Sequence, residues 1–376
     1  MTEIYLIRHA QAEGNRYRMM QGQWDGDVTD LGRWQIEGLA LRFREEPVDL
    51  VWSSDLFRAR LTATAATRWQ QLPLHTDEAL REINIGPWET LFFGNVCHDE
   101  PESARIFMFD SEHWVHEGAE TYGQVADRAY ACMERIAREN PGKRIALFSH
   151  GVTLRCIMSR VTGIGLNDTE HLPICRNTAV SKLTYENGVF TPVFYNDDSH
   201  LSEGSRAHWS LTGDLRHVRF DPDADREYYV RCYADAWQTA HGSLAGFQAE
   251  VYLDAALRHH AARPGSVLRF YRQGEPVGLL DMDPGRGAHA GYGWISLLYL
   301  HPEYRNQGYG IQLLARAYEL CRLSGRRSLR LHVADANAMA LAFYRREGFR
   351  ELSREHRGQG DLLLMEKKLG GPRDVR

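Results

Sequence analysis

The chain has 376 residues, which is long for a single hydrophobic core, so two domains are expected. Its 43% hydrophobic and 25% charged residues are ordinary for a globular protein, and a formal net charge of -5 gives no reason to expect binding to nucleic acid or to an anionic membrane. No apolar run approaches the ~20 residues of a membrane helix, and the N-terminus lacks the pattern of a signal peptide. The six cysteines have no CxxC spacing, which indicates reduced thiols in a cytoplasmic protein.

The first half of the chain alternates strand and helix patterns, as is typical of the α/β class. The expected strands are short apolar runs at 4–7, 48–52, 145–148, 180–185 and 189–195. The expected helices are amphipathic stretches at 29–45, from about Phe57, at 122–139 and at 152–162. A polar loop rich in Gly and Asn follows the first strand. The segment 87–120 mixes aromatic, His and acidic residues without a period, so it is expected to be irregular.

A second unit follows a change in composition. The chain turns polar and loses its periodicity after 196, which predicts domains at 1–203 and 215–370 with a linker at 204–214. Strand patterns then recur at 215–220, 267–271, 277–281, 294–300 and 328–333, with two more near the end. Helical stretches occupy 224–240, 244–260, 309–324 and 336–347.

Charged and polar residues follow three of the apolar runs in the first half. Arg8 and His9 come after the first run, the segment 53–58 with Arg58 follows the second, and His150 follows the third. In open α/β sheets, ligand sites lie outside the carboxyl ends of the strands. If the three strands are parallel, two His and two Arg therefore converge on one crevice. Such a crevice would bind a dianion beside an imidazole that could attack phosphorus.

These residues belong to a larger set of motifs in one order along the chain. The motifs are LIRHAQAEGN at 6–15, TDLG at 29–32, SSDLFRA at 53–59, LREINIGPWE at 80–89 and SHG at 149–151. Together they resemble the signature of the histidine phosphatase superfamily, which includes cofactor-dependent phosphoglycerate mutases. The resemblance covers roughly 1–201 and implies a three-layer α/β/α fold of the phosphoglycerate mutase type.

The resemblance implies that His9 attacks phosphorus and becomes a phosphohistidine, which water later cleaves. His9 must be neutral to attack, so its second ring nitrogen is expected to donate to a backbone carbonyl. The phosphoryl oxygens are expected to be bound by Arg8, Asn15, Arg58 and His150. No metal is required, because side chains supply the positive charge.

Glu82 is the expected general acid, which protonates the leaving alkoxide and then acts as base on the attacking water. Glu13 and Glu89 are competitors for this role, because the acid varies in position within the superfamily. Thr90 stands where a glycine is usual, which affects the shape of the loop rather than the chemistry.

Two alternatives concern the segment between Glu82 and His150, which is expected to cover the pocket. It looks short beside the mutases and similar to the broad phosphatases, so phosphatase activity is favoured over isomerisation of phosphoglycerate. Its three histidines are His98, His113 and His116. They are expected to be polar residues of the segment that covers the pocket, with metal ligation as the alternative.

The second half contains the string YLHPEYRNQGYG at 299–310, where a strand leads through a turn into a helix. The start of a helix offers unpaired N–H donors and a partial positive charge, so this turn is an anion cradle. Gly308 and Gly310 let a pyrophosphate approach the backbone closely. The spacing differs from a Rossmann fingerprint.

This string and NAMALAFYRREGF at 337–349 resemble the acetyl-CoA-binding pattern of the GCN5-related N-acetyltransferases, or GNAT family. The resemblance covers about 215–369 and implies an α+β domain with a mixed, splayed sheet. Its implied acetyl-CoA-binding residues are Leu300, Arg305, Asn306, Gln307, Gly308, Tyr309, Gly310 and Asn337. Tyr344 would protonate the departing CoA thiolate, a task suited to a phenol. As isolated residues, Asn337 would instead cap a helix and Tyr344 would pack in its core.

The base that deprotonates the amine is left open, with Asp281, Asp283 and Glu303 as candidates. The sequence therefore predicts a fusion of a metal-independent phosphatase, acting on a small phosphate ester, with an acetyl-CoA-dependent N-acetyltransferase, acting on a small amine. The missing base leaves one alternative for the second domain, in which it binds acetyl-CoA without turnover and gates the phosphatase.

Overall fold

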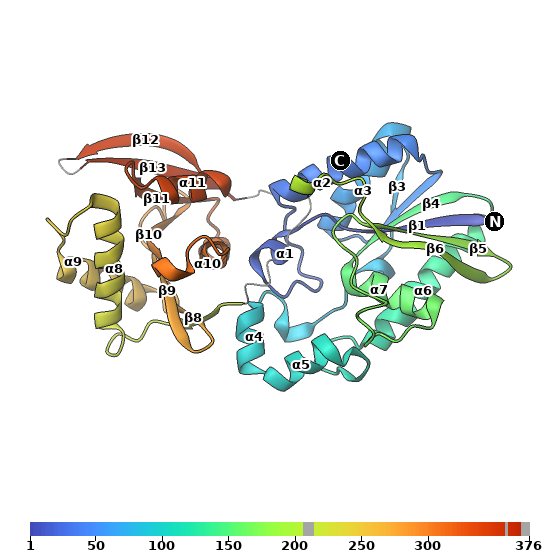
Figure 1. The fold of residues 1–376 in the computed structure, drawn as a ribbon, viewed down its shortest axis with the longest axis horizontal. Coiled ribbons are helices and arrows are strands. Elements are labelled where there is room, and N and C mark those ends of the chain that lie inside the picture. Colours follow the sequence, from blue (N-terminus) through green and yellow to red (C-terminus); the bar gives the residue numbers. More distant parts are fainter. Residues whose placement is uncertain (206–213, 358–359, 370–376) are drawn as a thin grey trace. The chain divides into compact units, whose positions relative to one another are not determined.

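The computed structural model describes residues 1–205, 214–357 and 360–369, which fall into two compact units (Figure 1). Most of the predicted linker, 204–214, lies outside the described residues, so the domain bounds stay predictions. None of the described helices is long and apolar enough to cross a membrane.

The first unit is built on a six-stranded sheet in the order β3-β2-β4-β1-β5-β6 (Figure 1). Its strands are β1 (Thr2–Arg8), β2 (Leu50–Ser53), β3 (Leu74–Thr76), β4 (Arg144–Ser149), β5 (Val180–Glu186) and β6 (Val189–Asp197). Strands β1 to β4 pair in parallel, and β5 and β6 pair antiparallel. The expectation that the strands leading to His9, Arg58 and His150 are parallel is therefore confirmed.

Helices cover both faces of this sheet because its central strands are apolar on both sides. The main helices are α2 (Asp30–Glu45), α3 (Phe57–Gln70), α6 (Tyr122–Glu139) and α7 (Gly151–Thr162). Tyr5 and Ile7 of β1 share a buried cluster with α2 and α3, whereas Ile4 and Leu6 share another with α6 and α7. Successive strand residues point to opposite faces, so the three-layer α/β/α arrangement is confirmed.

The expectation of an irregular segment at 87–120 is wrong. The segment contains α4 (Phe93–Asp99) and α5 (Pro101–Phe109), with the short 3-10 turns η2 (Gly86–Trp88) and η3 (Ser111–His113). Both helices are too short to show an amphipathic period, and Pro101 favours the first turn of α5. They pack around the fully buried rings of Trp88 and Trp114. A further short helix, α1 (Glu13–Tyr17), also replaces part of the expected polar loop.

The second unit contains a seven-stranded sheet in the order β12-β13-β11-β10-β9-β8-β7 (Figure 1). Its strands are β7 (Arg216–Arg219), β8 (Val267–Arg272), β9 (Glu275–Asp283), β10 (Tyr292–Leu300), β11 (Ser328–Ala334), β12 (Arg350–Arg357) and β13 (Gly360–Lys368). Among the described strand pairs of this sheet, only β10–β11 is parallel, so the sheet is mixed as expected.

Strands β10 and β11 separate partway along their length. They pair from Tyr292 with Ser328 to Ile295 with Leu331, after which β10 continues beside β9 alone. The register of β10 against β9 shifts between Ile295 and Leu297, which marks a bulge at Ser296. The expected splay of the sheet is therefore present. Beyond Ile295, the edge of β10 that faces β11 is not paired with that strand.

Four helices flank the second sheet: α8 (Arg226–His241), α9 (Ala249–Ala262), α10 (Gly310–Leu323) and α11 (Ala338–Arg346). Helices α8 and α9 share a buried cluster with Leu279, whereas Leu313 of α10 lies against the neighbouring Gly278. Neighbouring strand residues face opposite sides, so α10 covers the other face. Helix α9 starts later than the expected 244, because Gly246 holds a turn with φ of +76°.

Candidate active sites

In the first unit, the carboxyl ends of β1 and β4 bring Arg8, His9 and His150 to one edge of the sheet. Arg8 is paired with Ser149 across the two parallel strands, so the residues that follow them lie side by side. The ring centroids of His9 and His150 are 5.1 Å apart. Arg58 adds its side chain from the first turn of α3, and it is 0% exposed. The structure therefore places the four predicted residues together.

The environment of His9 suits a nucleophile. Its Nδ1 lies 2.7 Å from the carbonyl oxygen of Ala10, which can only accept a hydrogen bond, so Nδ1 carries the proton and Nε2 keeps its lone pair. Burial lowers the pKa of His9 well below its usual value, and the charges of Arg58 and Arg8 lower it further. The ring is therefore neutral at physiological pH.

Both arginines keep a buried N–H donor after their structural bonds are made. Arg8 donates to the carbonyl of Cys175 at 2.6 Å, and Arg58 donates to the carbonyls of Gly22 and Trp24 at 2.7 and 2.9 Å. The Nε atoms of both arginines are buried and have no partner among the described residues. Burial lowers the pKa of Arg58 to about 10, so the guanidinium stays charged at neutral pH. Buried unpaired donors of this kind favour an oxyanion ligand.

His150 has one ring nitrogen engaged and one without a described partner. Its Nε2 lies 2.8 Å from the hydroxyl of Ser54, while its buried Nδ1 contacts no hydrogen-bond partner in the described chain. If the Ser54 hydroxyl donates to Nε2, then Nδ1 carries the proton and can donate to a phosphoryl oxygen. Burial lowers the pKa of His150 well below its usual value, with Arg58 as the next cause, so the ring is a neutral donor.

We expect Ser54→Ala to lower kcat/KM for phosphate esters by about tenfold, because His150 would lose the bond that fixes its tautomer. The measurement is steady-state hydrolysis of an aryl phosphate. Ser159→Ala is the matched control, since the Ser159 hydroxyl donates to the carbonyl of Ile164 at the end of α7. Equal activity of the two variants would contradict a role for Ser54 at the site.

Glu82 is held where α7 begins, directly after His150. Its two carboxylate oxygens accept bonds from the backbone N–H groups of Val152 and Thr153 at 3.2 and 3.1 Å, and from the Thr153 hydroxyl at 3.1 Å. Burial lowers the pKa values of both buried arginines, and the charge of Glu82 is the largest influence that raises them. Glu82 is therefore the carboxylate that the pocket itself engages most directly.

The competing carboxylates bind other backbone groups, although the charge of Glu89 also acts on Arg58. Glu13 accepts a bond from the backbone of Asp27 at 3.0 Å, and Glu89 accepts one from the backbone of Gln23 at 2.8 Å. The geometry favours Glu82 over both.

Asn15 is linked to the backbone of His9 through Asn177, a connection that the sequence did not reveal. Its Oδ1 accepts from the N–H of Ala12 at 3.0 Å and faces Nδ2 of Asn177 at 3.4 Å. Asn177 also donates to the carbonyl of His9 at 2.9 Å. Asn177 belongs to no motif and lies 168 residues from His9 in the chain, so the sequence did not reveal this contact. These bonds engage Oδ1 of Asn15, so its Nδ2 group is left to bind a ligand.

The three histidines of the 87–120 segment do not gather into a metal site. His113 lies 2.8 Å from Asp110, His116 lies 3.0 Å from Glu100, and His98 is exposed. Across the described ranges, no group of three His, Cys, Asp or Glu residues could hold a metal ion. Metal ligation by these histidines therefore has no support in the geometry.

The lowered pKa values of His9 and His150 predict a loss of stability in acid. Both histidines are neutral when folded and bind protons near pH 6.5 when unfolded, so the unfolded state binds more protons as the pH falls below 6.5. Each contributes up to about 1.4 kcal/mol of lost stability per pH unit in that window. Thermal unfolding of wild type and of His9→Gln, measured from pH 7.5 to 5.5, checks this. We expect a shallower decline in the variant, and parallel declines would contradict the assignment.

In the second unit, the loop between β10 and α10 presents free backbone donors. The N–H groups of Asn306, Gln307 and Gly308 donate to no described residue. Asn306 and Gly308 have φ angles of +58° and +84°, which turn the backbone toward the start of α10 at Gly310. Such a run of donors at a helix start fits a pyrophosphate.

Several predicted acetyl-CoA-binding side chains have structural partners. Arg305 donates to the carbonyl of Leu300 at 2.8 Å and to Asp235 at 3.1 Å, and the ring of Tyr309 is fully buried. Asn337 caps α11 by accepting from the N–H of Ala340 at 3.1 Å. These side chains shape the loop and helix, so contact with a cofactor through their backbone or remaining atoms stays a prediction.

Tyr344 lies buried on α11, with the rings of Phe343 and Phe349 each 5.3 Å from its own. Burial raises the pKa of its phenol, so the hydroxyl keeps its proton at neutral pH. That state is the one a proton donor needs.

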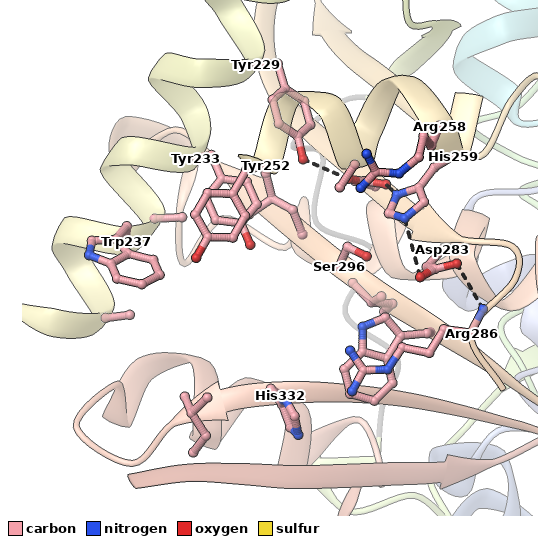
Figure 2. A pocket seen from close by; sticks show the side chains of 18 of the residues that line it. Tyr229, Tyr233, Trp237, Tyr252, Arg258, His259, Asp283, Arg286, Ser296 and His332 are labelled. Carbon is pink, nitrogen blue, oxygen red and sulfur yellow. Dashed lines mark hydrogen bonds and ion pairs between the residues drawn. The ribbon is translucent and has the colours of Figure 1, made fainter. Parts of the chain in front are cut away.

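A cavity of about 930 Å³ opens between α8, α9 and the splayed strands (Figure 2). Asp281 and Asp283 line it, whereas Glu303 is exposed on the loop and does not. His259 lies between the two aspartates, with Nδ1 2.7 Å from Asp281 and Nε2 3.4 Å from Asp283. Burial lowers the pKa of His259, but the Asp281 hydrogen bond and both carboxylate charges outweigh it and raise the pKa overall. Sequence reasoning missed His259, which carries no motif.

Comparison with known proteins finds a family for each unit. The family model "Histidine phosphatase superfamily (branch 1)" matches residues 4–198, and the model "Acetyltransferase (GNAT) family" matches residues 225–349. The "Probable phosphoglycerate mutase GpmB" of Escherichia coli O1:K1 / APEC is 29% identical over 190 residues, which are 50% of this chain and 88% of that protein.

A relative of the same name from Shigella boydii serotype 18 is 28% identical over the same share of each chain. The solved structure of Bacillus stearothermophilus YhfR has a TM-score of 0.52 and 26% identity, and it covers 53% of this chain and 99% of that one. Both resemblances drawn from the sequence motifs are confirmed. The chain belongs to the histidine phosphatase superfamily, and its second unit contains a GNAT acetyltransferase domain.

Proposed function

We propose that the first unit is a phosphomonoesterase that works through a phosphohistidine at His9. The observation that carries the proposal is that the neutral His9 is buried together with Arg8, Arg58 and His150. The Nε atoms of both arginines and Nδ1 of His150 have no partner among the described residues. Histidine phosphatases need no metal, and here side chains supply the positive charge.

The reaction proceeds in two steps. In the first, Nε2 of His9 forms a bond to phosphorus as the ester P–O bond breaks, and the protonated form of Glu82 gives its proton to the leaving oxygen. In the second, Glu82 takes a proton from water as that water attacks phosphorus and the P–N bond breaks. Inorganic phosphate leaves, and His9 and Glu82 return to their starting states. Arg8, Arg58 and His150 stabilise the charge on the phosphoryl oxygens in both steps.

The test is hydrolysis of a generic aryl phosphate and a panel of phosphometabolites, by wild type and His9→Ala, with a metal chelator present. We expect activity in wild type that the chelator does not change and that the variant lacks. Loss of activity on chelation would overturn the metal-free route.

Phosphoglycerate isomerisation is the second candidate, favoured by the mutase name of the Escherichia coli relative. A mutase must keep its phosphohistidine until the intermediate reorients, whereas a phosphatase admits water. Isomerisation that depends on added bisphosphoglycerate, at a rate above phosphate release, would replace the phosphatase proposal with this one.

We propose that the second unit transfers an acetyl group from acetyl-CoA to a small amine. GNAT domains generally use acetyl-CoA. The free N–H groups of Asn306, Gln307 and Gly308 fit its pyrophosphate, and the unpaired edge of β10 up to Leu300 fits its extended arm. When bound, acetyl-CoA supplies the acetyl group as a thioester.

The residues of the chain handle the protons of this transfer. The group formed by Asp281, His259 and Asp283 takes up a proton from the amine, and Tyr344 gives one to the departing thiolate. Asp281 is fully buried and is bound by the Tyr229 hydroxyl at 2.7 Å, so it acts through His259.

We expect Gly308→Val to weaken acetyl-CoA binding by about tenfold, because a β-branched residue at φ of +84° costs about 1–2 kcal/mol and would move the backbone donors. Isothermal titration calorimetry with acetyl-CoA measures the effect. Gly325→Val is the control, since Gly325 has a comparable φ of +66° at the end of α10 and open space where a Cβ would lie. Equal losses in both variants would show that the loop does not form the binding site.

Acetyl-CoA binding without turnover would make the second unit regulatory. That alternative requires phosphatase rates that change with acetyl-CoA and no CoA release with any amine. A panel of amines assayed for CoA release decides between the two.

A further inference from the structure

The cavity of the second unit has two ends of different chemistry (Figure 2). In Figure 2, Tyr233, Tyr252 and Trp237 lie on one side and His259 and Asp283 on the other, with Ser296 between them. Ser296 is the bulge residue of β10, and His332 of the separating strand β11 also lines the cavity. The cavity therefore opens into the splay where the acetyl group is expected.

The apolar end is a wall of aromatic rings from α8 and α9. Tyr233 and Tyr252 stack with centroids 4.1 Å apart and planes inclined by 19°, and Trp237 lies 5.7 Å from Tyr252. Phe247 backs the wall, nearly parallel to Tyr252 at 10°. All three cavity-lining rings are only partly buried, so they offer surface to a ligand. A rigid aromatic wall favours a flat aromatic body over a flexible alkyl chain.

The polar end carries two carboxylates around one imidazole. Asp281 is 0% exposed, and Asp283 and His259 have side chains 27% and 12% exposed. Arg258 and Arg286 also line the cavity, but both are exposed, and Arg286 stacks on Trp294 at 3.3 Å. Charges at exposed positions are screened by solvent. Even with His259 protonated, the inner groups carry one net negative charge, which attracts a cation.

We propose that this cavity binds an amine attached to an aromatic ring, with the amine at Asp283 and His259 and the ring against Tyr233, Trp237 and Tyr252. The proposal rests on the proposed acetyl transfer and names the class of its acceptor. Hydrogen-bond acceptors at one end receive the ammonium group, and the aromatic wall receives the ring. The amine then lies beside Ser296, at the mouth of the splay.

The first test is binding to the full chain without acetyl-CoA, measured by isothermal titration calorimetry. The probes are phenethylamine, cyclohexylethylamine, which has a similar apolar body without a flat ring, and phenethyl alcohol, which lacks the amine. We expect phenethylamine to bind about tenfold more tightly than either. Equal affinity for the cyclohexyl compound, or no binding of phenethylamine, would overturn the proposal.

Two pairs of variants locate the contacts. Trp237→Ala is expected to bring the ratio of phenethylamine to cyclohexylethylamine affinity close to one, while Trp237→Phe keeps a preference for the flat ring. Asp283→Asn retains the turn that Asp283 makes with the N–H groups of Gly285 and Arg286. It is expected to weaken phenethylamine about tenfold and leave phenethyl alcohol unchanged. A ratio unaffected by Trp237→Ala would contradict the aromatic wall as the ring site.

Failure of this proposal is separable from failure of the proposed acetyl transfer. If phenethylamine binds but releases no CoA in the presence of acetyl-CoA, the binding site stands and the transfer activity does not. If alkyl amines are acetylated while phenethylamine neither binds nor reacts, the transfer stands and the aromatic acceptor does not.

Discussion

His9→Ala is expected to lower phosphatase kcat/KM by at least about a thousandfold, because it removes the imidazole proposed to form the phosphoryl–enzyme bond. His9 is the buried imidazole whose Nδ1 is bound to a carbonyl and whose Nε2 is left with its lone pair. The measurement is kcat/KM on the best phosphate ester from the panel.

Acetyl transfer by the same variant should match wild type, because the two sites lie in separate compact units. His98→Ala, which removes an exposed histidine, is the matched control and should keep phosphatase activity. If His9→Ala retained more than a few per cent of wild-type hydrolysis, the phosphohistidine route would be wrong.

Arg58→Lys is expected to damage both activity and stability. Arg58 is 0% exposed, binds the carbonyls of Gly22 and Trp24, and keeps a buried Nε without a partner among the described residues. A lysine ammonium cannot reproduce this planar fork, so a buried carbonyl would lose its donor. We expect kcat/KM to fall by about a hundredfold and unfolding stability of the first unit by about 2 kcal/mol.

Differential scanning calorimetry and steady-state kinetics measure the two effects of Arg58→Lys. Arg68→Lys is the control, because the Arg68 pair with Glu37 lies at the surface and such pairs contribute about 0–1 kcal/mol. Wild-type kinetics for Arg58→Lys would mean that the phosphoryl group does not lie against Arg58.

The first site could be predicted from the sequence because the topology of the sheet brings its residues together. The apolar runs before His9, Arg58 and His150 proved to be neighbouring parallel strands, whose carboxyl ends share one edge of the sheet. Once three such runs are recognised, convergence follows without knowledge of any side-chain position. The same reasoning identified the loop around Gly308 as a helix start with free donors.

Contacts between residues far apart in sequence could not be predicted. Ser54 orients His150 across 96 positions, and Asn177 binds the backbone of His9 across 168. His259 projects from α9 into a group with Asp281 and Asp283 that only the packing of helix on sheet creates. Asn177 and His259 belong to no motif, and the motif at 53–59 that contains Ser54 does not reveal its contact with His150.

The roles of polar loop residues in the second unit were hard to predict for a different reason. Their side chains can form hydrogen bonds with backbone groups close to them in the chain. Asn337 caps α11 and Arg305 closes its loop, so their polarity alone does not distinguish a ligand contact from a structural one. The helices of 87–120 were missed because each is only two or three turns long. Their buried residues belong to the cluster around Trp88 and Trp114.

The most direct test of the central claim is to trap the intermediate. Wild type and His9→Ala are mixed with excess aryl phosphate in the presence of chelator, quenched in base, and examined by intact-protein and peptide mass spectrometry. We expect a single added phosphoryl group on the peptide that contains His9, stable to base and lost in acid, in wild type alone. A phosphoryl group on another residue, or an equal adduct in His9→Ala, would contradict catalysis through His9.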